Sequence, residues 1–487
     1  MNKAESKKGF VKDMTTGSVY KLLISFSIPM LIGNIFQQIY NTIDSMVVGK
    51  HVGTKALAAV GATGSLNFLF FSLCIGLTGG IGIVISQYFG AGDIKKVRTA
   101  IFNSIHITFL SALTMSIIGV CFARKILLML NTPLDIIDDA ESYLRITSAA
   151  ILAVAAFNCV SSILRALGDT KTPLIFLIIS SIINVILDLF FVIKLNLGVK
   201  GVAYATVISQ ILSAIGSFVF AISTNDYFRI SKEERHYNHE ITLKCYKLGL
   251  PLAMQSSLIA ISCVALQNVV NTFGSTVVSA FTATSRIEQL IQQPFNSFGL
   301  ALSTFTGQNI GARKLDRVKE AFSKSLIIIT IISFSTFLIF NVFGCNIMCA
   351  FVNDEEVINL GQTALRITSL FYFSLGMIYI GRGLLNGAGD SVYAMINGMI
   401  EVAGRIIFAN LLIMIPFVGK WGVWMATALT WFITGAASYI RYKQGKWKNI
   451  QVVSEKRGNT KWILSRALHL EHLRERNLLK ERKRMKV

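Results

Sequence analysis

Long apolar blocks alternate with short polar stretches along the whole chain. Two of these blocks, 173–193 and 325–343, run for about twenty residues with almost no charge, which as a helix is the length that crosses the roughly 30 Å hydrocarbon core of a bilayer. The pattern predicts twelve membrane-spanning helices, over 20–48, 55–88, 96–121, 138–164, 172–195, 200–224, 243–271, 276–308, 316–343, 356–385, 390–416 and 420–442.

The second half of the chain repeats the first. The segment Leu144–Ser148 (LRITS) recurs unchanged at 365–369, an offset of 221 residues. Other pairs agree in the same order at 221 or 222: Gln87 with Gln308, Gly90 with Gly311, Gly168-Asp169 with Gly389-Asp390, Gly201-Val202 with Gly422-Val423, and Pro29 with Pro251. Because each half holds six spans, the halves share one orientation across the membrane. The predicted fold class is an all-α integral membrane protein with twelve transmembrane helices in two pseudo-symmetric six-helix lobes.

Polar segments set the expected domain limits. They define a cytoplasmic N-terminus (1–19), an N-lobe (20–224), a cytoplasmic linker (225–242), a C-lobe (243–442) and a basic cytoplasmic tail (443–487). Lysine and arginine are concentrated in the N-terminus, in the linker and in the loops after the second, fourth and eighth spans. Positive charge marks cytoplasmic loops, so we expect a multi-pass protein of a bacterial cell membrane with both termini in the cytoplasm.

The basic tail has an apolar periodicity of its own. Trp462, Ile463, Leu470 and Leu473 recur at helical spacing among arginines. Two interpretations remain open at this point: an amphipathic helix that lies on the cytoplasmic membrane surface, or a frayed basic extension.

The composition excludes several classes of protein. Hydrophobic residues make up 53% of the chain and charged residues only 15%, against roughly 25% charged in soluble domains, so a soluble enzyme and a disordered chain are excluded. The net charge of +21 first suggests a nucleic-acid partner, but most of the cations lie in the tail and in short loops beside lipid headgroups. We expect membrane lipid and no nucleic acid as a partner, a monomer, and no enzymatic activity, since no catalytic constellation is present.

Two acids inside predicted spans are the strongest candidates for a functional site. An acid at mid-membrane costs about 2.5–3.5 kcal/mol on insertion scales, so it persists where it faces a cavity, a partner or an ion. Gln37, Asn41 and Asp44 share one face of the first span, and Asn184 and Asp188 share one face of the fifth. Such carboxylates can exchange a proton, or bind Na⁺ together with amide and hydroxyl oxygens. The structural alternative is a polar pair that only fixes helix packing.

The second half carries a different polar set. Glu288 and Gln292 lie in the eighth span, and Glu401 and Arg405 lie four apart in the eleventh, where they can form an ion pair. These residues fit either a substrate cavity or a structural strut between helices. The candidate substrate-cavity residues are Gln37, Asn41, Glu288, Gln292, Glu401 and Arg405.

Glycine and proline inside the spans favour packing and bending over ligand binding. Gly76 and Gly80 form a G-x-x-x-G pair, which lets two helices approach closely, and no P-loop lysine accompanies them. Pro29 and Pro294 each remove a backbone hydrogen bond from their helix, so we expect kinks there.

Taken together, these motifs resemble the multidrug and toxic compound extrusion (MATE) family over residues 18–442. The resemblance rests on Ile28-Pro29-Met30, Tyr40–Asp44 (YNTID), 87–92 (QYFGAG), 165–169 (RALGD), Asn184–Asp188 (NVILD) and 198–206 (GVKGVAYAT).

The resemblance implies a twelve-helix fold with two lobes that open alternately, and export of organic cations driven by entry of H⁺ or Na⁺. It places a cation site at Asp44, Asn184, Asp188 and Thr206, without a cofactor and with no metal beyond Na⁺ at that site. One branch of the family uses an acid in the seventh span, where this chain has Gln255 instead. The alternative function is a lipid or lipid-linked oligosaccharide flippase of the same superfold, which would need a cavity lined with cations and a lateral opening to lipid.

Overall fold

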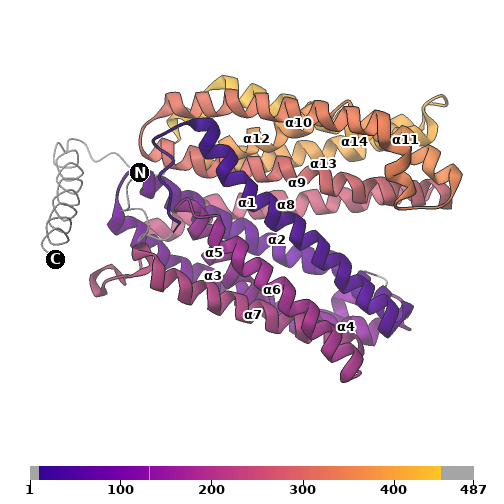
Figure 1. Ribbon diagram of the computed structural model, residues 1–487, viewed down its shortest axis with the longest axis horizontal. Coiled ribbons are helices and arrows are strands. Elements are labelled where there is room, and N and C mark those ends of the chain that lie inside the picture. The colour runs from indigo at the N-terminus through magenta and orange to yellow at the C-terminus, as the bar shows by residue number, and fades with distance from the viewer. Residues whose placement is uncertain (1–9, 131, 451–487) are drawn as a thin grey trace, which may run out of the picture.

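The computed structural model describes residues 10–130 and 132–450, and these residues form two bundles of helices (Figure 1). The first lobe contains α1 (Val19–Val47), α2 (Thr54–Gly90), α3 (Ile94–Met129), α4 (Ile137–Ala149), α5 (Ile151–Ala166), α6 (Lys171–Leu189) and α7 (Gly198–Thr224). The second lobe contains α8 (His239–Asn271), α9 (Ser275–Gly311), α10 (Leu315–Cys349), α11 (Glu355–Ser369), α12 (Tyr372–Ala388), α13 (Ser391–Ile413) and α14 (Gly422–Gln444). The described residues contain no strand. The predicted surface helix of the tail falls almost entirely within 451–487, outside the described residues.

These helices confirm the predicted fold class. Nine helices of the described chain are long and apolar enough to cross a membrane, and two bent pairs, α4 with α5 and α11 with α12, raise the number to eleven. The one predicted span that does not meet this criterion is the eighth, 276–308, which corresponds to α9. This helix carries Arg286, Glu288 and several glutamines and is correspondingly less apolar. It runs for 37 residues inside the second bundle.

Two predicted spans differ from single straight helices. The span predicted at 138–164 is broken at Ala150 with a bend of 44°, and the one predicted at 356–385 is broken at Leu370 and Phe371 with a bend of 52°. Neither break contains proline or glycine and the apolar pattern continues through both, so the sequence gives no local sign of them. The breaks occupy equivalent positions of the two halves, as the internal repeat requires.

The two lobes meet at one end of the bundle and diverge toward the other (Figure 1). The meeting end, called here the linker end, carries the N-terminal segment, the 91–93 turn and the segment 225–238 that joins α7 to α8. At this end the side-chain amide of Gln87 donates to the Gly387 carbonyl (3.0 Å), and that of Gln308 donates to the Ala166 carbonyl (2.9 Å). Gln308 lies 221 residues after Gln87, and Gly387 lies 221 residues after Ala166. Each lobe therefore donates an equivalent hydrogen bond to the other.

The N-terminal segment fills the junction between the lobes. Met14 is fully buried, its N–H donates to Gln308 Oε1 (2.8 Å), and its carbonyl accepts from the side-chain amide of Asn309 (3.2 Å). Two residues earlier, the Lys12 N–H donates to the Leu167 carbonyl of the first lobe (3.1 Å). The segment therefore binds both lobes and covers the linker end of the interface.

Glycines bring α2 of the first lobe against α8 of the second. A Cβ atom at Gly76 would lie 2.3 Å from the Ala253 backbone, and one at Gly80 would lie 2.4 Å from the Gly249 nitrogen. The two helices are thus in backbone contact, which confirms the packing role predicted for the G-x-x-x-G pair.

Candidate functional site

Three helices of the first lobe bring the predicted coupling residues together. Asp44 comes from the end of α1, Asn184 and Asp188 come from α6, and Thr206 comes from α7. The side-chain amide of Asn184 donates to Thr206 Oγ1 at 3.5 Å, and the Asp44 and Asp188 carboxylates lie close enough to interact electrostatically. Residues that lie up to 162 positions apart in the sequence thus form one polar cluster.

The two carboxylates of this cluster lack a neutralising partner. Asp188 is fully buried, and neither of its oxygens has a hydrogen-bond partner; the same holds for Asp44 Oδ1 and Asn184 Oδ1. In the part of the chain that the structure describes, no lysine, arginine or histidine pairs with either acid. A buried carboxylate without a counter-charge is unfavourable unless it is protonated or binds a cation, so the cluster has the chemistry of a site for H⁺ or a small monovalent cation.

Two tyrosines complete the walls of the cluster. Tyr40 on α1 and Tyr143 on α4 both lie close enough to Asp44 and Asp188 to interact electrostatically with them. Tyr143 is 7% exposed. The sequence gives no sign of Tyr143, because this residue comes from α4 and approaches the cluster through the packing of α4 on α7.

The polar residues of the second lobe form a closed ion-pair network. Glu401 on α13 binds Arg382 of α12 (2.6 Å) through one oxygen and Arg405 of its own helix (2.8 Å) through the other. Both Glu401 and Arg405 are buried. The pairing of Glu401 with Arg405 confirms the prediction from their spacing, and the saturated carboxylate favours the structural strut over a substrate contact.

The network extends from these ions to four helices. Arg382 also donates to Asn397 Oδ1 (2.7 Å), whose amide binds the Ser438 hydroxyl on α14 (3.0 Å), while Arg405 donates to the Ser262 hydroxyl on α8 (3.0 Å). Sequence reasoning missed Arg382, although it is the one charged residue of its apolar segment. An arginine inside a membrane span usually pairs with a buried acid. The lone arginine of this segment could therefore have predicted an ion pair with an acid such as Glu401.

Glu288 and Gln292 lie beside this network on α9. Glu288 is near Arg405 and Thr368, and its Oε1 has no hydrogen-bond partner. Gln292 Oε1 accepts a hydrogen bond from the Tyr379 hydroxyl of α12 (3.1 Å). Both side chains are half-buried in the second lobe.

The other two candidate cavity residues lie on a polar stripe of α1 that faces α9. Asn34 Nδ2 donates to Ser297 Oγ (3.3 Å), which fixes the register of α1 against α9. One and two turns beyond Asn34, away from the linker end, Gln37 and Asn41 are exposed. On α9, the exposed Arg286 lies three turns from Ser297 on the same side of the helix. Polar, solvent-exposed stripes of both lobes thus face each other where the lobes diverge.

The described residues contain no group of three or more histidine, cysteine, aspartate or glutamate side chains arranged to hold a metal ion. The polar cluster of the first lobe is built from two acids, an amide and a hydroxyl, which is an oxygen donor set of the kind that hard cations prefer.

A two-lobed bundle of membrane-spanning helices, with a buried acidic pair in one lobe and polar stripes between the lobes, is the architecture of a secondary transporter. The MatE family profile matches residues 29–190 and 251–418, one match in each lobe. The chain therefore belongs to the MATE family of transporters, as its sequence motifs predict.

Relatives and solved structures agree with this assignment. The chain is 28% identical to the probable multidrug resistance protein YpnP of Bacillus subtilis over 91% of this chain and 99% of the relative. It is 22% identical to the multidrug export protein MepA of Staphylococcus aureus, covering 83% and 89%. A solved MATE family transporter described as outward-facing superimposes with a TM-score of 0.85 at 22% identity, over 92% of this chain and all of that one.

Proposed function

We propose that this protein is a multidrug exporter of the bacterial cell membrane, coupled to the entry of H⁺ or Na⁺, with its linker end in the cytoplasm. Its substrates are organic cations and other amphipathic compounds, and it works as a monomer without a resident cofactor. Curated relatives along nearly the whole chain are named as multidrug resistance and multidrug export proteins, which supports the export of drugs.

The observation that carries the coupling proposal is the unpaired acidic pair. Asp44 and Asp188 lie together inside the first lobe, and the described chain offers them no counter-charge. A strut would be expected to saturate its charges, as Glu401 does in the second lobe. The unpartnered oxygens of the pair instead support one exchangeable cation, held by the carboxylates and by the oxygens of Asn184 and Thr206.

The coupling cycle follows from charge neutralisation. Binding of H⁺ or Na⁺ removes the repulsion between the two carboxylates and lets α1 move closer to α6, while release toward the cytoplasm restores that repulsion. Pro29 lies within α1, fifteen residues before Asp44, and interrupts the helix hydrogen bonds there. Movement of the Asp44 end of α1 about this point changes the wall that carries Gln37 and Asn41.

The polar stripes supply the contacts for diverse substrates. Gln37 and Asn41 each offer both a donor and an acceptor, so their side chains can adapt to ligands of different chemistry. The flippase alternative would need free cations between the lobes. Of the three arginines described above, Glu401 neutralises Arg382 and Arg405, and Arg286 is exposed between the lobes. One arginine is not a cationic lining, and this favours the exporter.

The experiment is uptake of a fluorescent organic cation into everted membrane vesicles under an imposed H⁺ gradient and then under a Na⁺ gradient. Uptake driven by one of these gradients identifies the coupling ion. The variant Asp188→Asn keeps the size of the side chain and removes its charge, and we expect it to reduce gradient-driven uptake to background.

The matched control is Asp226→Asn, an exposed acid of the linker whose side chain is 63% exposed. This variant is expected to transport like the natural chain. Normal coupled uptake by Asp188→Asn would refute the coupling site, and uptake by the natural chain without either gradient would refute antiport.

A further inference from the structure

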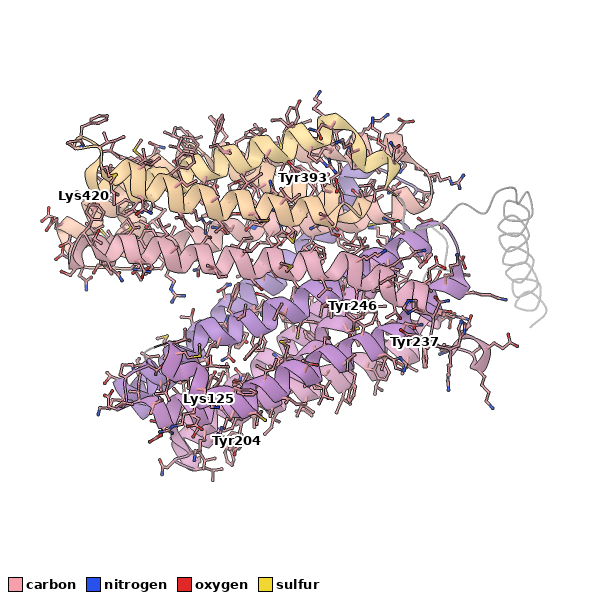
Figure 2. The ribbon with its side chains drawn as sticks, turned by 180° about the vertical axis from the view of Figure 1, so that it is seen from behind. Lys125, Tyr204, Tyr237, Tyr246, Tyr393 and Lys420 are labelled. Carbon is pink, nitrogen blue, oxygen red and sulfur yellow. The ribbon has the colours of Figure 1, made fainter. Side chains whose placement is uncertain are left out.

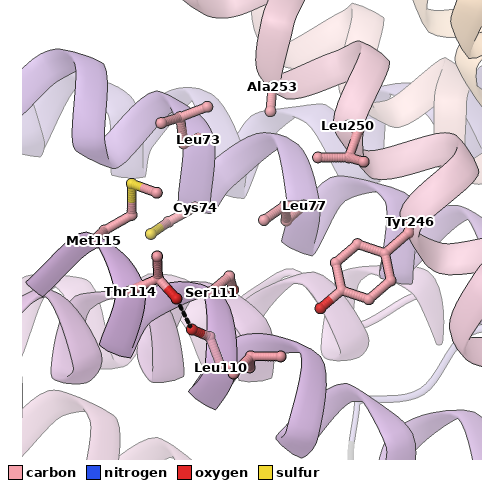
Figure 3. Close-up of a pocket in the computed structure, with 10 residues that line it drawn as sticks. All are labelled: Leu73, Cys74, Leu77, Leu110, Ser111, Thr114, Met115, Tyr246, Leu250 and Ala253. Atoms are coloured by element: carbon pink, nitrogen blue, oxygen red, sulfur yellow. Dashed lines mark hydrogen bonds between the residues drawn. The ribbon is translucent and has the colours of Figure 1, made fainter. Parts of the chain in front are cut away.

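A groove on the outer face of the bundle lies at the seam between the lobes. It encloses about 270 Å³ between α2 and α3 of the first lobe and α8 of the second (Figure 3). Its floor is formed by the buried Cys74 and Leu77, while Leu110 (60% exposed) and Leu250 (49% exposed) stand at its mouth. The groove therefore opens outward, away from the lobe cores.

The lining offers an incoming ligand almost no polar contacts. The hydroxyls of Ser111 and Thr114 donate to the carbonyls of Ile107 and Leu110 on their own helix (2.6 and 2.8 Å). The remaining lining atoms are hydrocarbon or sulfur, apart from the Tyr246 hydroxyl, which points toward the groove (Figure 3). Such a surface binds an aliphatic group.

Aromatic residues place this groove at a definite depth in the membrane. His106 of α3 packs edge-on against the exposed Tyr237 (ring centroids 6.4 Å apart), close to Tyr246 and near the linker end (Figure 2). Tyrosine rings are enriched at the membrane–water boundary. Leu250 and Ala253 follow Tyr246 by about one and two helical turns, roughly 6 and 10 Å deeper. The medium at the mouth of the groove is therefore lipid hydrocarbon.

The aliphatic lining of the groove, more than its size, points to a chain instead of a whole drug molecule. Pockets that enclose drug-sized ligands measure roughly 300–1,000 Å³ and carry several placed polar groups. At about 270 Å³ and with an aliphatic lining, this groove suits a segment of one acyl chain.

A basic side chain lies where the headgroup of such a lipid would be. Lys247 is exposed on the same face of α8 as Leu243, Leu250 and Met254, and its long stem can extend along lipid while the ammonium reaches the interface. Lys247 has no ion pair among the described residues, whereas its neighbour Lys244 is bound to Glu240 (2.6 Å). A free ammonium one turn of α8 from Leu250, at the mouth of the groove, suits an anionic phosphate headgroup.

We infer that the α2–α3–α8 groove binds one acyl chain of an anionic phospholipid, with Lys247 and Tyr246 at its headgroup. The walls of the site come from both lobes, and Ala253 of its lining is also in backbone contact with Gly76 of the first lobe. The groove keeps this shape only while the lobes are joined along this seam, so the bound lipid stabilises the arrangement of lobes seen here over arrangements that separate α2 from α8.

The test uses the full-length protein in vesicles containing phosphatidylglycerol with a photoreactive group in one acyl chain, followed by mass spectrometry of the labelled peptides. We expect labelling of the segments 73–77, 110–115 and 246–253 to exceed that of the lipid-facing surface of α10 several-fold. Ser111→Phe fills the groove and is expected to remove this excess. The matched control Ser335→Phe, on an exposed position of α10, is expected to retain it.

Competition with unlabelled lipid tests the headgroup contact. In the natural chain, phosphatidylglycerol should displace the probe at a lower concentration than phosphatidylcholine does. Lys247→Gln should abolish this difference between the two lipids. The control Lys319→Gln, which removes an exposed pair with Asp316, should leave the difference unchanged. Equal labelling of all lipid-facing helices, undiminished labelling in Ser111→Phe, or cross-links to a second copy of the chain across the groove would each overturn the proposal.

Discussion

The two lobes share one scaffold and differ in the chemistry that they carry at equivalent positions. At the offsets of the internal repeat, the C-lobe counterparts of Asp44, Asn184, Asp188 and Thr206 are, in the same order, Leu266, Arg405, Ala409 and Thr427. Leu266 and Ala409 are buried in an apolar cluster of the second lobe. The position that holds an unpaired carboxylate in one lobe is thus a hydrocarbon core position in the other.

This difference separates an acid that is free to bind a cation from one that is already bound. The acidic pair of the first lobe has no ion pair with an arginine or lysine of the described residues, whereas in the second lobe Glu401 lies between two arginines and Glu288 lies near one of them. A repeated fold therefore does not imply a repeated site. Under the proposed function, the balance of charges around each acid separates the lobe that exchanges ions from the lobe that its ion pairs hold rigid.

The largest expected effect is the loss of transport from the unpaired pair. Asp44→Asn removes one charge without breaking any ion pair of the described structure, so export should fall to background while the free energy of unfolding changes by less than about 1 kcal/mol. Vesicle uptake and thermal unfolding of the purified protein measure the two quantities. Loss of stability together with export would show that the pair is a strut.

The ion-pair network of the second lobe should respond in the opposite way. Glu401→Gln leaves Arg382 and Arg405 buried without their counter-charge, and removal of one partner from a buried ion pair costs about 3–5 kcal/mol. We expect a large fall in the thermal midpoint. Asp226→Asn, which breaks an exposed pair with Arg229, is the control and should cost at most about 1 kcal/mol.

An unchanged midpoint in Glu401→Gln would contradict the strut interpretation and return Glu401 to the set of substrate contacts. The two predictions differ in the property that should change. Neutralising Asp44 in the first lobe should reduce transport, whereas neutralising Glu401 in the second should reduce stability.

The sequence is sufficient for the spans, the repeat and the residues of the first-lobe polar cluster, since each leaves a local mark: apolar length, a fixed offset, or an acid in an apolar block. The coupling role of that cluster stays a prediction. It is insufficient where structure depends on packing between distant segments. Arg382 and Glu401 are nineteen residues apart on different helices. Tyr143 approaches the acidic pair of the first lobe only because α4 packs against α7. The breaks at Ala150 and Leu370 leave no mark because the helices bend without a helix-breaking residue.

The interface between the lobes, unlike their sites, should behave symmetrically. A Cβ at Gly311 would lie 1.9 Å from the Gln87 carbonyl oxygen, and one at Gly90 would lie 1.9 Å from that of Gln308. Gly311→Ala and Gly90→Ala should therefore destabilise the closed linker end to a similar extent, by about 1–3 kcal/mol each. Thermal unfolding measures the effect.

The matched control is Gly64→Ala on α2, where an added Cβ meets nothing within 4 Å. Alanine has the better helix propensity, so this variant should be neutral or more stable by up to about 1 kcal/mol. If all three glycine variants behave alike, the effect is one of helix propensity and the symmetric contact between the lobes makes no contribution.

The smallest expected effect concerns the linker that joins the two lobes. Glu234 accepts hydrogen bonds from the Ser231 N–H (3.0 Å) and hydroxyl (2.8 Å) and lies 3.4 Å from Arg98 of α3. Burial pushes the pKa of Glu234 upward, but these hydrogen bonds and the arginine charge outweigh it, so its pKa lies below the ordinary value. The carboxylate therefore fixes the linker to the first lobe only while it is ionised.

Because the folded-state pKa is lowered, the stabilisation is complete above the ordinary glutamate pKa of about 4.3 and disappears as the pH falls through the lower folded-state pKa. Glu234→Gln should speed hydrogen exchange of the Ser231 amide near pH 7, consistent with a loss of about 1 kcal/mol, and the difference from the natural chain should vanish in acid. Glu233→Gln, at an exposed neighbouring position, should exchange like the natural chain at every pH. A difference between Glu234→Gln and the natural chain that persists in acid would mean that side-chain packing, and not the charge of Glu234, holds the linker against α3.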